Sequence, residues 1–191
     1  MKRLARILFA IILLLISFSI RADAAQYSDP AFGYSFAYPD TWHALKWANE
    51  PNVVVLRNFP DDQSLQLGNV PFGGAQITLI VYPPYAPGWS ADTDEYAELH
   101  AVAARVGTIL SETTRASGTP ARVKSTRATA SATTNTSIWT LLRLRGRMFK
   151  MGMEYQTADP AGLQYEQIFS DLLASLSASG KAPTPSVAPT P

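Results

Sequence analysis

Large aromatic residues alternate with small residues in the stretch FGYSFAYPDTW, which spans residues 32–42. Side chains two positions apart lie on the same side of an extended chain, so Phe32, Tyr34, Phe36 and Tyr38 share one face. The Pro-Asp pair that follows predicts a turn. Burial of each ring contributes about 1.5–3 kcal/mol to folding. We therefore interpret this stretch as a core strand rather than as a platform for a ligand.

The corner after this strand is an exception. Trp42 and His43 lie just beyond the turn at residues 39–40, where neighbouring side chains can face either the core or a cleft. We therefore keep Trp42 and His43 as candidate cleft residues.

The N-terminal residues predict an export sequence. Lys2, Arg3 and Arg6 precede an apolar run over residues 7–20, and residues 22–24, Ala-Asp-Ala, have the small-x-small pattern of a signal peptidase site. The run is shorter than the roughly 20 residues that span a bilayer. We predict a signal peptide at residues 1–24, cleaved to leave a secreted or periplasmic protein. A retained membrane anchor is the alternative.

The C-terminal residues predict a tail that does not join the core. Residues 181–191, KAPTPSVAPTP, contain four prolines, a composition that favours extended polyproline conformations. We expect a disordered Pro/Thr-rich tail at residues 178–191 and one folded domain over residues 26–177. The chain has no cysteine, which excludes a disulfide framework, a lipoprotein anchor and thiolate chemistry.

The formal charge of +1 for the whole chain comes from the predicted signal peptide. Residues 25–191 contain 12 basic and 14 acidic residues, so their formal charge is −2. A general nucleic-acid binder usually has a clear excess of basic residues. Nucleic acid is therefore not an expected partner.

Strand and helix patterns predict an α+β fold. We expect helices over residues 92–107, with Asp92 and Glu95 as a capping box, and from Asp159, with Pro160 at the first helical position. Strands are expected at residues 32–38, 42–47, 52–59, 75–82, 108–115 and 121–130, and a β-hairpin over residues 137–156. Strands joined by short turns pair antiparallel, and amphipathic helices need a sheet face to cover. The prediction is a central, mainly antiparallel sheet flanked by helices.

Basic residues are concentrated at the predicted hairpin. Seven of the twelve cations after residue 24 fall between residues 122 and 150. Four of them surround the hairpin turn: Arg143, Arg145, Arg147 and Lys150. Such a cluster is either a solvated edge that prevents strand aggregation or a surface that docks an acidic protein or an anionic envelope component. These four residues are the candidate docking patch.

No pattern predicts a catalytic, cofactor or metal site. The two histidines, His43 and His100, are far apart in the sequence and have no neighbouring ligand cluster. Motifs of serine hydrolases are absent, and the acidic residues at 61–62 and 92–95 lack the spacing of a calcium loop. Long loops are often functional. A small-ligand or cation site under the glycine-rich loop at residues 60–74 is therefore an alternative prediction.

Several stretches resemble the PsbP-like family, whose fold is the PsbP and Ran-binding-protein type of α+β sandwich. FGYSFAYPDTW is similar to the family's G-aromatic-x-aromatic-x-x-Pro-x-x-Trp opening. AQITLIVYP, DEYAELHAVAARVG, SGTPA and YEQIFSDLLASL follow in the family's order, and the resemblance covers nearly all of residues 27–177. It implies a central antiparallel sheet flanked by helices, in a non-catalytic binding or assembly module. None of these motifs is a binding motif, so no metal or partner residue is implied.

The sequence as a whole predicts an exported, non-enzymatic domain without a cofactor. It would bind another protein or help assemble an envelope complex. A small-ligand binder is the second hypothesis. A hydrolase is the least supported, because no nucleophile and base are visible.

Overall fold

The computed structural model describes residues 24–47, 49–60, 70–82, 95–113, 120–129 and 132–179. Its largest element is a seven-stranded sheet in the order β3-β4-β5-β9-β8-β7-β6, in which every neighbouring pair is antiparallel. The strands are β3 (His43–Lys46), β4 (Val53–Arg57), β5 (Ala75–Tyr82), β6 (Thr108–Thr113), β7 (Ala121–Ala128), β8 (Thr134–Leu144) and β9 (Arg147–Gln156).

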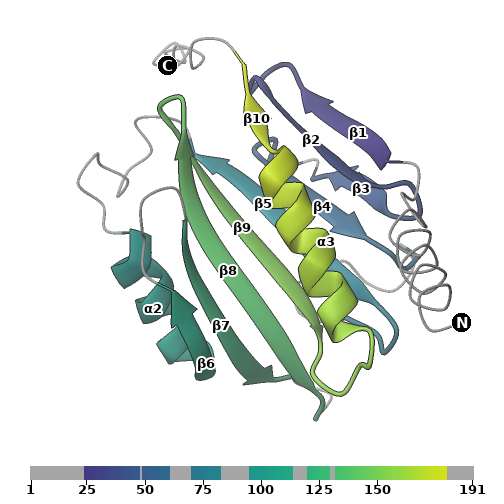
Figure 1. Ribbon diagram of the computed structural model, residues 1–191, viewed down its shortest axis with the longest axis vertical. Helices are drawn as coiled ribbons and strands as arrows, with labels where there is room; N and C mark the ends of the chain where they lie inside the picture. The colour runs from purple at the N-terminus through teal and green to yellow at the C-terminus, as the bar shows by residue number, and fades with distance from the viewer. Residues whose placement is uncertain are drawn as a thin grey trace, which may run out of the picture.

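A second, three-stranded sheet and two helices complete the described fold (Figure 1). The small sheet has the order β1-β2-β10 and is also antiparallel. Its strands are β1 (Ala24–Asp29), β2 (Tyr34–Pro39) and β10 (Ser177–Ala178), and the helices are α2 (Glu95–Val106) and α3 (Gly162–Ser175). The α+β class with a large antiparallel sheet and flanking helices is confirmed.

The layers are arranged around the large sheet. Helix α3 and the small sheet lie in front of it in Figure 1, and the main core fills the space between them. Tyr34 and Phe36 of β2 and Phe169 of α3 are buried there against Ile77 and Met151 of the large sheet. Helix α2 packs on the opposite face over β7 and β8, where its Leu99 and Ala103 form a second, smaller core.

The aromatic strand is a core element, as predicted. The rings of Tyr34 and Phe36 are buried, and those of Phe32 and Tyr38 pack against the same cluster. The strand lies in the small sheet, where it pairs with β1, and Phe36 stacks on Tyr27 with ring centroids 5.1 Å apart. Strand β1 was not predicted, because Ala, Gln, Ser and Asp have weak strand preferences.

Helix α3 begins later than expected. Its first residue is Gly162, and Ala161 precedes it as an N-cap without a side-chain hydrogen bond. Asp159 therefore does not cap the helix. Its carboxylate accepts hydrogen bonds from the backbone N–H of Ala161 (2.9 Å) and of Gly73 (2.8 Å), which joins the start of α3 to the residues before β5. The predicted cap of α2, Asp92, lies outside the described residues.

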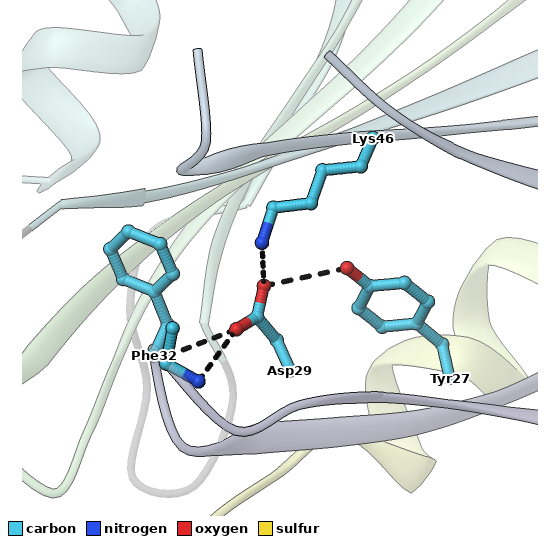
Figure 2. A network of polar contacts seen from close by, with 5 residues as sticks. Tyr27, Asp29, Phe32 and Lys46 are labelled. Atoms are coloured by element: carbon cyan, nitrogen blue, oxygen red, sulfur yellow. Dashed lines mark hydrogen bonds and ion pairs between the residues drawn. The ribbon is translucent and has the colours of Figure 1, made fainter. Parts of the chain in front are cut away.

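A polar network connects the two sheets. Asp29, the last residue of β1, accepts hydrogen bonds from the backbone N–H of Ala31 (3.0 Å) and Phe32 (3.1 Å) and from Lys46 Nζ of β3 (2.8 Å) (Figure 2). The hydroxyl of Tyr27 approaches the same carboxylate at 3.4 Å. The network holds the β1–β2 turn and attaches the small sheet to the edge of the large one.

The ends of the described domain differ slightly from the predicted boundaries. Ala178 pairs with Tyr34, and the N–H of Ser179 donates to the carbonyl of Gly33 at 2.8 Å, so the first two residues of the predicted tail join β2. Residues 1–23 and 180–191 lie outside the described residues. Within the described residues, no helix is long and apolar enough to cross a membrane.

Candidate functional site

A cleft of about 600 Å³ lies between the end of β2 and helix α3. We call it the α3 cleft. Most of its lining is apolar or aromatic, from Ala24, Ala37, Tyr38, Pro39, Trp42, Ala161, Tyr165, Ile168 and Leu172. Its polar lining residues are Thr41, Asn58, Gln164 and Asp171. Ligand-binding pockets in proteins have this volume and this mixture of apolar walls with a few polar groups.

The walls of the cleft follow from the two elements that form it. Tyr165, Ile168 and Leu172 are three and four positions apart, so they lie on one face of α3. Strand β2 stops at Pro39, where the N–H of Trp42 donates to the Pro39 carbonyl at 3.0 Å. This turn brings the buried indole of Trp42 into the lining.

Hydrogen bonds attach both ends of α3 to the rest of the fold, so the cleft beside α3 is formed without a ligand. At the C-terminal end, the N–H of Ala37 donates to Ser175 Oγ at 2.9 Å. At the N-terminal end, Asp159 makes the two backbone contacts described above, and the Tyr165 hydroxyl approaches its Oδ2 at 3.4 Å. Burial and the neighbouring Asp159 raise the pKa of Tyr165, so its hydroxyl stays protonated.

A further contact ties α3 to the large sheet. Glu166 Oε1 accepts hydrogen bonds from Lys124 Nζ and from the Tyr155 hydroxyl, both at 2.6 Å. Burial alone would raise the pKa of Glu166, but these two donors and the charge of Arg122 hold it below its usual value. Glu166 is therefore ionised at neutral pH, and its two hydrogen bonds attach α3 to the large sheet.

The mouth of the cleft is acidic. Asp171 lines it, and the exposed Asp40 lies between two lining residues, Pro39 and Thr41. Gln167 Nε2 donates to Asp171 Oδ1 at 2.8 Å, and this amide brings no opposite charge to the carboxylate. None of the described residues that line the cleft is basic.

Two exposed apolar side chains lie near the start of α3, at the end of the cleft that Ala161 lines. Phe72 is 62 % exposed and Leu163 is 81 % exposed. The Gly73–Asp159 hydrogen bond brings the residue after Phe72 to the turn that begins α3, and Leu163 lies in the first turn of that helix. Contiguous exposed apolar surface marks sites of protein–protein contact, and these two side chains would extend the apolar lining of the cleft into such a surface.

The structure separates the two predicted cleft residues. Trp42 lines the α3 cleft, whereas the exposed His43 lies on β3 beside a smaller hollow of about 300 Å³ with Leu45, Phe59 and Pro60. Their separation follows from the alternation of side chains along an extended chain.

The hairpin cations are divided between the two faces of the sheet. Arg147 pairs with Leu144 on the face toward α3 and is only 2 % exposed; its Nη1 donates to the Ser179 carbonyl at 3.4 Å. Arg143 and Lys150 lie on the face toward α2, where Lys150 Nζ is 5.3 Å from the centre of the Trp139 ring. Arg145 is exposed at the turn. The docking patch predicted from the sequence must therefore be redrawn without Arg147.

The hairpin turn has two residues. Leu144 pairs with Arg147, and Arg145 and Gly146 between them have φ angles of 48° and 77°. Two consecutive positive φ angles are the pattern of a type I′ turn, which favours Asn-Gly. Glycine is therefore well suited to this turn, but arginine is not.

A row of buried polar residues crosses the α2 side of the large sheet. Strand pairing places Arg57, Gln76, Glu154 and Ser137 side by side on β4, β5, β9 and β8. Arg57 Nε donates to Gln76 Oε1 (2.8 Å), and Glu154 Oε1 accepts from Ser137 Oγ (3.0 Å) and from Arg127 Nη2 (2.8 Å). These groups bond to each other, so we interpret the row as structural.

The alternative site under the loop at residues 60–74 falls largely outside the described residues, because residues 61–69 are not described. The same holds for Asp61, Asp62, Asp92 and Asp94. The part of the chain that the structure describes contains no group of three or more acidic or histidine residues that would hold a metal ion. His100 is on the surface, with Nδ1 2.5 Å from Glu112 Oε1.

The sequence did not predict most of the residues that line the α3 cleft. Tyr165, Ile168 and Leu172 belong to the apolar stripe of the last helix, which predicts core packing but does not show where the core ends. Tyr38 was likewise assigned to the core with the rest of its strand. The one useful indication was the corner at Trp42, which predicted a possible cleft at the correct end of β2.

Comparisons with known proteins identify the fold. No protein-family model matches the chain, and no curated protein matches its sequence. Among solved structures, the Saccharomyces cerevisiae Ran-binding protein Mog1p matches with a TM-score of 0.54 and 12 % identity, over 82 % of this chain and 96 % of that one. Cyanobacterial PsbP (CyanoP) from Synechocystis sp. PCC 6803 matches with a TM-score of 0.50 and 14 % identity, over 85 % and 96 %.

A protein from Bacteroides thetaiotaomicron also matches, with a TM-score of 0.50 and 13 % identity over 81 % of this chain. The match covers 48 % of that protein, so this chain spans about half its length. Identities of 12–14 % show a shared fold alone. The resemblance found in the sequence is thus confirmed at the level of structure: the chain has the α+β sandwich fold of the PsbP/Mog1-like family.

Proposed function

We propose that this protein is an exported, non-catalytic binding module, and that it docks a protein partner in the α3 cleft as part of an envelope assembly. The observation that carries the proposal is a preformed aromatic cleft with exposed Phe72 and Leu163 beside it. A small ligand would need the cleft alone. The exposed apolar residues outside the cleft favour a larger surface of contact, as a protein provides.

The charge of the cleft identifies the chemistry of the partner segment. Asp40 and Asp171 flank the mouth, and none of the described lining residues compensates them. Complementary charge gives specificity and faster association. We therefore propose a segment with apolar side chains next to Lys or Arg.

A peptide library tests this proposal. Random peptides would be selected on residues 25–191, which contain every described strand and helix except the first residue of β1. We expect selected peptides to combine aromatic or aliphatic residues with Lys or Arg. Their affinity should fall at least tenfold in Asp171→Lys. Glu50→Lys, which makes the same change of charge at an exposed position between β3 and β4, is the matched control and should have little effect. Acidic peptides, or peptides insensitive to Asp171→Lys, would contradict the proposal.

A small-ligand function is the second candidate, because about 600 Å³ is also the size of a metabolite pocket. A thermal-shift screen with lipids, sugars and cations tests it. A ligand at 100 times its dissociation constant raises the free energy of unfolding by about 2.7 kcal/mol. A shift that is abolished by the cleft-blocking variant Gln164→Trp would favour this candidate.

The hairpin cations Arg143, Arg145 and Lys150 are a second proposed docking surface, for an anionic envelope component. Arg145 has a positive φ angle, which asparagine and glycine tolerate better than arginine does. The backbone of the turn therefore gives no reason for an arginine here. Vesicles with phosphatidylglycerol should bind more protein than phosphatidylcholine vesicles do. The double variant Arg143→Glu/Arg145→Glu should remove the difference, and equal binding to both vesicles would argue against this surface.

A further inference from the structure

The α3 cleft opens where the described chain begins. Ala24 is the first residue of β1, pairs with Pro39 and lines the cleft. Residues 1–23 are therefore attached to the described domain beside the cleft, through the peptide bond to Ala24.

Those preceding residues have the chemistry that the cleft favours. Residues 7–20 are almost entirely apolar, and Arg21 follows them. Arg21 is three positions from Ala24, which places it within roughly 10 Å of the mouth, close enough to approach Asp40 or Asp171. The apolar run extends over about 21 Å as a helix, so one of its faces is long enough to cover the groove beside α3.

We propose that, in the uncleaved chain, the apolar segment at residues 7–20 occupies the α3 cleft and excludes the partner until it is removed. This inference rests on the proposed function of the cleft and adds its regulation. Attachment at Ala24 gives the segment a high effective concentration at the cleft, in the millimolar range for short connections. A partner that arrives from solution competes poorly against it. Cleavage after Ala24 ends that advantage and leaves all but the first residue of β1 in place.

The absence of cysteine makes the proposal directly testable by cross-linking. The chain of residues 1–191, made by cell-free translation without membranes, keeps residues 1–24. Ser17→Cys would be combined with Gln164→Cys in the cleft, or with Gln26→Cys on the exposed side of β1 as a control for simple tethering. We expect the 17–164 disulfide to form at least fivefold faster than the 17–26 disulfide, and urea to abolish the difference. Equal rates would overturn the proposal.

Exchanging the charges of residues 21 and 171 gives an independent test of the proposal. Arg21→Glu should slow the 17–164 cross-link several-fold, and Asp171→Arg added to it should restore the rate. An unchanged rate in Arg21→Glu would show that charge does not guide the segment and would contradict that part of the proposal. Gln164 and Asp171 are both exposed, so these variants keep the fold.

The two proposals fail in different ways. The uncleaved chain should bind the selected peptides at least tenfold more weakly than residues 25–191 do. If the peptides bind both forms equally, the cleft is a docking site but the segment at residues 7–20 does not occlude it. If that segment cross-links to the cleft but no peptide is selected, the occlusion is supported and the proposed chemistry of the partner is wrong.

Discussion

Lys46 Nζ lies 2.8 Å from Asp29 Oδ2 and thereby pairs an edge strand of the large sheet with the end of β1 in the small one. The Asp29 side chain is 1 % exposed, whereas that of Lys46 is 42 % exposed. Burial alone would raise the pKa of Asp29, but the hydrogen bonds from Lys46 and from the backbone N–H of Phe32 and Ala31 hold it below its usual value. The same hydrogen bond raises the pKa of Lys46.

Lys46→Met should lower the free energy of unfolding by about 1–2 kcal/mol at neutral pH, because a buried carboxylate loses a charged donor while solvent screens part of the effect. A lowered carboxyl pKa stabilises above about pH 4 and is lost as the pH falls through the folded value. A raised amine pKa stabilises below about pH 10 and is lost above it. Urea unfolding at pH 7, 5 and 3 should therefore show a difference from the wild type that shrinks at low pH. A constant difference would contradict the role of the pair.

Arg145→Asn should stabilise the protein by about 1 kcal/mol, because asparagine tolerates the left-handed conformation of this turn position better than arginine does. Arg145→Ala is the matched control: it removes the charge but keeps a side chain that is strained at a φ of 48°. Stabilisation by both variants alike would show that charge repulsion, rather than backbone conformation, is responsible. Thermal unfolding monitored by circular dichroism measures the difference.

Charge reversal should distinguish two neighbouring arginines of the hairpin. Arg147→Glu places an acid at a buried site and should cost about 3 kcal/mol, or roughly 6–12 °C in Tm. Arg145→Glu at the exposed turn should leave the Tm within about 2 °C, since exposed surface substitutions have small effects. Scanning calorimetry of the two variants side by side would show similar values if both side chains were solvated.

Gly152→Ala should destabilise the large sheet by about 1–3 kcal/mol, because a Cβ at this position would overlap the ring of Trp139 on β8. Trp139→Leu removes the obstructing ring. In a double-mutant cycle, Gly152→Ala should therefore cost less in the Trp139→Leu background than in the wild type. Additive effects would mean that the glycine is needed for another reason.

Much of the fold was predictable because its elements have regular patterns. The alternation in β2, the β-branched run in β4 and the apolar stripe of α3 each predict one element, and all three are present. The two strands that escaped, β1 and β10, have no such pattern: β1 has weak strand preferences, and β10 has only two residues. Their pairing partner, β2, is what makes them strands.

The candidate site was less predictable, because it depends on where the elements meet. Trp42 was identified as a possible cleft residue from its position after a turn. Tyr165 could not be, because the pattern that places it on the inner face of α3 is the same whether that face meets the core or a gap. Gln76 and Glu154 are polar positions within otherwise apolar strands. No prediction was drawn from them, and only the pairing of β5 with β9 shows that they lie side by side in the buried polar row.

The central pairing of the large sheet also bears on how fast the protein folds. Strand β5 pairs with β9 across a long stretch of chain, from Tyr82 with Met148 to Ala75 with Tyr155. Each of these contacts closes a loop of more than sixty residues before it contributes any stability. Sheets built on such distant contacts fold in milliseconds to seconds rather than microseconds. A newly made chain is therefore expected to stay open for a comparatively long time before its large sheet closes.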